Sequence, residues 1–125
     1  MRLGSLLVLL TLSLPASALA QVVDSTAAEL ALGKRTYEGR GLCWSCHGKA
    51  GEGVLGPTTS LADGKWLHSK GSREEIVAII MAGIEASKTR LGAAMPARGG
   101  SRITNREVEA VAAYVVALAS QKPTS

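Results

Sequence analysis

The amino-acid sequence predicts an all-α fold, because it repeats the pattern that starts a helix and lacks the pattern of a strand. In each repeat a hydroxyl residue precedes a glutamate by three positions, and the pairs are Thr26 with Glu29, Ser72 with Glu75, and Thr104 with Glu107. Such a capping box satisfies backbone N–H groups that the first helical turn leaves unpaired. No segment alternates apolar and polar residues convincingly with a period of two, as a half-buried strand does.

The first predicted helix runs from Thr26 to about Gly39. Three of its residues recur at three- and four-residue spacing, namely Leu30, Gly33 and Tyr37. That spacing places them on one face, as in a helix that packs against a neighbour.

The second and third predicted helices follow the other two capping boxes, and the third is expected to end before Pro123. The second has an apolar face made of Ile76, Ile79, Ile80 and Gly83. The third has an apolar arc made of Val108, Val111, Tyr114, Val115 and Leu118. Both helices are therefore expected to face a common core.

Two glycine-rich stretches, residues 48–64 and 92–100, lie between these helices and contain Pro57 and Pro96. Clusters of glycine and proline are typical of loops. Loops of this length are uncommon in a compact domain unless they serve a site. Wrapping a flat cofactor would explain both of them.

Residues 1–20 have the pattern of a secretory signal peptide. Arg2 is followed by an apolar run at residues 6–10 and then by Ala18-Leu19-Ala20, so cleavage after Ala20 is expected. An uncleaved membrane anchor is the alternative, although the apolar run is shorter than the roughly 20 residues that span a bilayer. Export places the protein outside the cytoplasm, most simply in a bacterial periplasm.

The remaining residues, 21–125, are enough for one domain only. Without Arg2 the net charge is about +3, and the basic residues are scattered singly, so nucleic acid is not an expected partner. Phenylalanine is absent and aromatic residues make up only 3% of the chain, which leaves little bulky apolar surface to bury. A large apolar cofactor would compensate for that deficit.

The chemistry is concentrated in Cys43-Trp44-Ser45-Cys46-His47, directly after the first predicted helix. This Cys-x-x-Cys-His pattern is the attachment sequence of haem c. The thiols of Cys43 and Cys46 can add to the two vinyl groups of one haem, and the next residue then lies where its imidazole reaches the iron. The sequence therefore predicts one covalently bound haem c, with His47 as an axial ligand.

Three other interpretations of the motif are weaker. A disulfide oxidoreductase also uses Cys-x-x-Cys, but it needs a strand and a helix around the motif, and no such unit is visible. A zinc site would need a fourth ligand, and His68 is the only other histidine. A structural disulfide remains possible in an exported protein.

Electron carriers usually complete the haem iron with a methionine or a second histidine. Met95 is the preferred candidate, because it lies in a loop next to Pro96, which favours an extended backbone at the preceding residue. Met81 lies away from the centre of its helix's apolar face and is expected to fill space in the core. His68 is the second choice. A thioether ligand favours Fe(II), so His47 and Met95 together predict a comparatively high reduction potential.

With these residues the chain resembles the class I cytochrome c family, in particular the haem c domains associated with terminal oxidases and periplasmic dehydrogenases. The resemblance covers nearly all of residues 21–125 and implies that the first and last helices cross, with the haem held between them and the two loops. Family members pack a glycine and an aromatic residue of the first helix against an aromatic residue of the last. The matching residues here are Gly33, Tyr37 and Tyr114.

The resemblance also implies two supporting roles at the haem. Pro57 matches a family proline whose carbonyl accepts the N–H of the ligating histidine. Trp66 matches a family tryptophan that can hydrogen-bond a haem propionate. The sequence departs from the family in two places. Tyr37 precedes Cys43 by six positions instead of the commoner four, and Thr58-Thr59-Ser60 separate Pro57 from Leu61.

An iron with both axial positions filled has no open site for oxygen or peroxide, so the predicted function is the transfer of single electrons between redox proteins. Two alternatives stay open, a dedicated haem c subunit of an oxidoreductase complex and a ligand-binding or peroxidatic haem protein with Met95 detached. A monomer is expected, with membrane contact only through partners. Four cations are expected to border a docking face for acidic partners, namely Lys49, Arg90, Arg98 and Arg102.

Overall fold

The computed structural model describes residues 16–121 and has the predicted all-α architecture. Its helices are α1 (Ala16–Glu38), α2 (Trp44–His47), α3 (Arg73–Ala82) and α4 (Asn105–Ser120). Three single turns of 3₁₀ helix lie in the connections, η1 (Pro57–Thr59), η2 (Ala86–Lys88) and η3 (Ala97–Gly100). The described chain contains no strand, only an isolated antiparallel bridge between Ile84 and Met95.

Two of the three predicted helix starts are confirmed. The Ser72 hydroxyl accepts the backbone N–H of Glu75 at 3.2 Å, and the Thr104 hydroxyl accepts that of Glu107 at 3.2 Å. Each glutamate in turn accepts the backbone N–H of its cap residue, so both capping boxes are complete. α3 and α4 therefore begin where the sequence places them.

The predicted start of the first helix at Thr26 is wrong, since α1 begins ten residues earlier at Ala16. A cap residue starts a helix only where its own backbone is not helical. Residues 16–25 contain no glycine or proline to interrupt the helix, so the helix continues through Thr26. The predicted end near Gly39 is confirmed.

Most of the expected signal peptide, residues 1–15, lies outside the described residues, and so does Pro123. The expected cleavage point after Ala20 falls within α1 of the full-length chain. Within residues 16–121, no helix combines the length and the apolar character that a membrane span requires.

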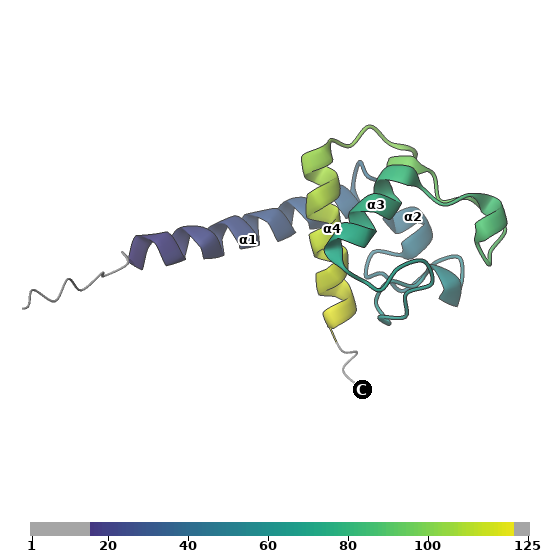
Figure 1. Ribbon diagram of the computed structural model, residues 1–125, viewed down its shortest axis with the longest axis horizontal. Helices are drawn as coiled ribbons and strands as arrows, with labels where there is room; N and C mark the ends of the chain where they lie inside the picture. The colour runs from purple at the N-terminus through teal and green to yellow at the C-terminus, as the bar shows by residue number, and fades with distance from the viewer. Residues whose placement is uncertain (1–15, 122–125) are drawn as a thin grey trace, which may run out of the picture.

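α1 and α4 cross, as the family resemblance implies, and Gly33 lies at the crossing (Figure 1). A Cβ atom on Gly33 would lie 2.1 Å from the carbonyl oxygen of Ala110, so only glycine lets the two backbones approach this closely. The rings of Tyr37 and Tyr114 pack edge to face beside this contact, with centroids 5.4 Å apart. The predicted trio is therefore assembled.

The core lies between α1, α3 and α4. Tyr37 and Val108 have no exposed surface, and the remaining buried apolar residues include Ile76, Ile80, Ile103, Val111, Val115 and Leu118. These side chains come from the faces that the helical spacing predicted, with Ile103 added from the segment before α4. One side of this core forms the wall of the cavity described below.

Arg73, in the first turn of α3, links the three long helices on the surface. Its guanidinium contacts Glu29 of α1 and lies 3.3 Å from a carboxylate oxygen of Glu109 of α4. All three side chains are more than a third exposed, so the network contributes little energy. The network connects the start of α3 to both α1 and α4, the two helices that cross.

The α4 capping box gives a pH-dependent contribution to stability. Glu107 has a lowered pKa because its carboxylate accepts the Thr104 N–H at 2.7 Å. A lowered folded-state pKa adds stability above the unfolded value of about 4.3, and this is lost as the pH falls through the folded-state value. Denaturant titrations should show that Glu107→Gln destabilises at about pH 7 and has a smaller effect at about pH 3. An equal effect at both pH values would contradict this account.

Candidate functional site

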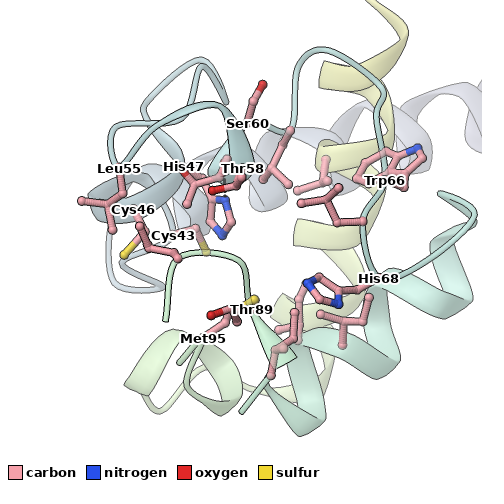
Figure 2. A pocket seen from close by; sticks show the side chains of 18 of the residues that line it. Cys43, Cys46, His47, Leu55, Thr58, Ser60, Trp66, His68, Thr89 and Met95 are labelled. Atoms are coloured by element: carbon pink, nitrogen blue, oxygen red, sulfur yellow. Dashed lines mark hydrogen bonds between the residues drawn. The ribbon is translucent and has the colours of Figure 1, made fainter. Parts of the chain in front are cut away.

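One cavity brings the predicted site residues other than Pro57 together, between the helical core and the two long loops (Figure 2). Its lining includes both cysteines, both histidines and Met95. The rest of its wall is mainly apolar and includes Leu61, Ile76, Ile79, Ile80, Val111 and Val115. A flat apolar group with a metal at its centre fits such a lining.

A sharp turn between α1 and α2 directs the motif toward the cavity. Leu42 adopts a left-handed backbone conformation with φ 59°, and the chain then enters the single turn of α2. The His47 N–H donates to the Cys43 carbonyl at 3.0 Å, which holds the motif in one helical turn. The connection between Tyr37 and Cys43 contains this turn.

Both thiols are free, and they differ in exposure. Cys43 is half-buried and Cys46 is exposed. Burial is the main cause that raises the pKa of the Cys43 thiol to about 11, so this thiol is protonated at neutral pH. Disulfide oxidoreductases need a lowered thiol pKa, so the site does not suit that chemistry. Within the described residues, no cluster of three or more histidine, cysteine or acidic side chains could hold a metal ion.

His47 is oriented by a single hydrogen bond. Its Nδ1 lies 2.7 Å from the carbonyl oxygen of Thr59, and since a carbonyl can only accept, Nδ1 carries the proton. The other ring nitrogen, Nε2, therefore keeps its lone pair for a metal. Burial lowers the pKa of His47, which further favours the neutral imidazole that can act as a ligand.

The carbonyl role expected for Pro57 is wrong, because Thr59 fills it. The Pro57 carbonyl instead accepts the N–H of Ser60 at 3.2 Å and closes η1. Pro57 is exposed and does not line the cavity. The extra residues between Pro57 and Leu61 form this 3₁₀ turn, which presents the carbonyl two positions later in the sequence.

Met95 lies opposite His47 across the cavity (Figure 2). Its backbone forms both hydrogen bonds of the bridge to Ile84, at 2.8 and 3.0 Å. Gly83 packs directly behind it, since a Cβ there would lie 2.5 Å from the Met95 carbonyl oxygen. The loop is therefore attached to the end of α3, and the thioether is held toward His47.

The two other ligand candidates have different positions. Met81 is 38% exposed and does not line the cavity, so the expectation that it fills the core is wrong. Its place on the outer side of α3 explains this, because the core-facing positions are Ile76 and Ile80. His68 is exposed but does line the cavity.

Trp66 lines the end of the cavity opposite the two cysteines (Figure 2). Gly71 provides the room for its indole ring, because a Cβ on Gly71 would lie 2.1 Å from the Trp66 Nε1. The indole forms no hydrogen bond with any part of the described chain. Its contact with a haem propionate stays a prediction.

The cations expected at a docking face differ in whether their side chains are exposed or bound within the chain. Arg90 is exposed at the cavity rim, and the Lys49 amine lies 6.0 Å from the centre of the Trp44 ring. Arg98 instead binds within the chain, where it donates to the Ile103 carbonyl at 2.8 Å and to the Asn105 side chain at 2.7 Å. It braces the Met95 loop against the start of α4, a role that sequence reasoning missed.

The lining fits a haem c group in its chemistry. Two thiols lie toward one end of the cavity, an imidazole and a thioether face each other across it, and the wall between is apolar. Thiol addition to a vinyl group breaks the S–H bond and the vinyl π bond, forms one C–S and one C–H bond, and needs no oxidant, so free thiols are the correct starting state. Imidazole and thioether are an established ligand pair of haem iron.

Comparison with known families supports this assignment. The model of the family described as cytochrome c oxidase, cbb3-type, subunit III matches residues 28–115, which is more than two thirds of the chain. No curated protein and no solved structure gives a significant match.

Proposed function

Because this chain belongs to the cytochrome c oxidase, cbb3-type, subunit III family, a class I c-type cytochrome family, we propose that it is an exported carrier of single electrons with one covalent haem c. We further propose that residues 1–20 are removed as a signal peptide and that residues 21–125 work in the periplasm as a monomer. In this proposal Cys43 and Cys46 form the thioethers, and His47 and Met95 are the axial ligands.

The observation that carries the proposal is the placement of His47 and Met95. His47 ends α2 and Met95 lies in a loop 48 positions later, yet their side chains face each other across the cavity, with the cysteines at its edge (Figure 2). Haem c supplies a one-electron iron couple when it is bound. The chain keeps His47 neutral through burial, holds its ring with the Thr59 carbonyl, and fixes the Met95 backbone through the bridge to Ile84.

Electron exchange requires a partner to approach the cofactor closely. The cysteine end of the cavity is accessible to a partner, since Cys46 is exposed and Leu42, Trp44, Val54 and Leu55 all leave 38% or more of their surface uncovered. Lys49 adds positive charge near this end, beside Trp44, and Arg90 adds it at the cavity rim. We propose that partners with acidic docking faces approach here. Lys49→Glu and Arg90→Glu should slow electron transfer and reduce its dependence on salt, whereas unchanged rates would contradict the proposal.

Replacing Met95 with Ala tests the ligand assignment. The change should remove the weak red absorption band of an iron–thioether bond, and it should lower the reduction potential because the thioether favours Fe(II). The pigment should stay attached, since both cysteines remain. Met81→Ala is the matched control and should leave the band and the potential unchanged, because Met81 does not line the cavity. Survival of the band in Met95→Ala would contradict the assignment.

A second candidate function is a dedicated haem c subunit that stays bound to one oxidoreductase complex. The description of the matched family, a subunit of an oxidase, favours it. Purification of the native protein at physiological salt distinguishes the two functions. A stable complex of defined composition would favour the subunit, and recovery of the free monomer would favour the diffusible carrier.

A further inference from the structure

His68 lies on the cavity, but the proposed electron transfer does not use it. Its side chain makes no hydrogen bond or ion pair with any described residue, whereas His47 is held by Thr59. Neither ring nitrogen of His68 therefore has a hydrogen-bond partner among residues 16–121. An imidazole beside a metal cavity is a potential ligand, since imidazole nitrogen suits iron.

Figure 2 shows on which side of the cavity His68 lies. In this view His47 lies on one side, Met95 and His68 both lie on the other, and the two cysteine sulfurs lie at the level between them. A haem attached through both sulfurs would therefore have His47 on one face and both Met95 and His68 on the opposite face. His68 is on the correct face to replace Met95.

The segment that carries His68 is held more weakly than the loop that carries Met95. Gly64 and Gly71 flank it with positive φ values of 67° and 88°. Between them, the backbone N–H groups of residues 66–68 donate no hydrogen bond to any described residue. The Met95 backbone, in contrast, forms two hydrogen bonds with Ile84. Moving His68 toward the cavity centre would break few interactions.

We propose that His68 is a reserve axial ligand, which binds the haem iron when the thioether of Met95 is absent or displaced. The exchange replaces an iron–sulfur bond with an iron–nitrogen bond and transfers no electrons. It keeps both faces of the iron occupied, so that a carrier that loses Met95 ligation does not become an open, ligand-binding haem. The inference rests on the proposed function, since it requires the covalent haem.

The test compares four holoproteins, namely Met95→Ala, His68→Ala, the double variant Met95→Ala/His68→Ala, and Met95→Ala/Leu67→Ala as a control. Leu67 also lines the cavity on the same segment but offers no nitrogen. Electron paramagnetic resonance of the ferric proteins should show a low-spin, bis-imidazole iron in Met95→Ala and in the Leu67 control. The double variant should be high-spin. His68→Ala alone should keep the thioether band of the unchanged protein.

Binding of cyanide to the ferric proteins gives a second measure. If His68 occupies the iron in about nine of ten Met95→Ala molecules, cyanide should bind about tenfold more weakly to Met95→Ala than to the double variant. A high-spin Met95→Ala protein, or a double variant that remains low-spin, would overturn the inference. Failure of the proposed function looks different, because the unchanged protein would then lack the thioether band or covalent haem.

Discussion

Replacing Cys43 and Cys46 together with serine should give a protein that holds haem only loosely and unfolds at a much lower temperature. The haem would then be retained only by its axial ligands and by contact with the apolar wall. A covalent tether keeps its ligand at an effective concentration on the order of millimolar, so cutting it makes occupancy depend on free haem. The expected result is a pigment that acidified organic solvent extracts from the protein.

The loss of stability follows from the cavity itself. Without haem, Ile76, Ile80, Val111 and Val115 would face solvent or an empty space on one side. The protein has few bulky side chains to close that space, since phenylalanine is absent. Circular dichroism melts should show a large fall in melting temperature relative to the holoprotein.

Ser45→Ala is the matched control, because Ser45 lies in the same turn but has no thiol, and its hydroxyl donates to the Leu42 carbonyl at 2.6 Å and lies 3.9 Å from the Cys46 sulfur. Its pigment should still resist extraction, and its melting temperature should stay close to that of the unchanged holoprotein. A double serine variant with pigment that resists extraction would show that these two residues do not attach the haem.

Gly33→Val should destabilise the protein although local helix propensity favours the change. Valine is slightly better than glycine in a helix interior, by a few tenths of a kcal/mol. Against this, even a Cβ at residue 33 would lie 2.1 Å from the Ala110 carbonyl oxygen and 2.8 Å from the Tyr114 Cβ. Overpacking of a close contact costs about 1–3 kcal/mol, so the steric effect dominates.

The variant should also disturb the haem side of the fold, because α1 leads directly into the attachment motif. For a domain of this size, each kcal/mol lowers the melting temperature by roughly 4–8 °C. Ala31→Val is the control. Ala31 is exposed on the same helix, so this change should destabilise the protein only through the lower helix propensity of valine. Equal melting temperatures for the two variants would contradict the close crossing of α1 and α4.

The features that the sequence predicts well are those set by local rules. The capping boxes at Ser72 and Thr104 work because each cap residue itself has an extended backbone. The start of α1 fails the same rule, because helix-compatible residues precede Thr26 and the helix propagates through it. Whether a capping pattern starts a helix thus depends on the residues before it.

The features that the sequence misses depend on contacts between distant segments. The replacement of the Pro57 carbonyl by that of Thr59 depends on how η1 folds back toward His47, although the extra residues before Leu61 were a visible signal. Arg98 hydrogen-bonds Ile103 and Asn105 from a left-handed backbone conformation with φ 54°. No sequence pattern predicts that conformation. Neither contact follows from periodicity.

One haem is expected to be bound covalently through Cys43 and Cys46, and an intact mass measurement of the exported, denatured protein tests this most directly. The account predicts a chain that begins at Gln21 and is heavier by one haem, with the added mass on the peptide that contains both cysteines. A chain without the added mass, from a preparation matured with haem available, would contradict the account.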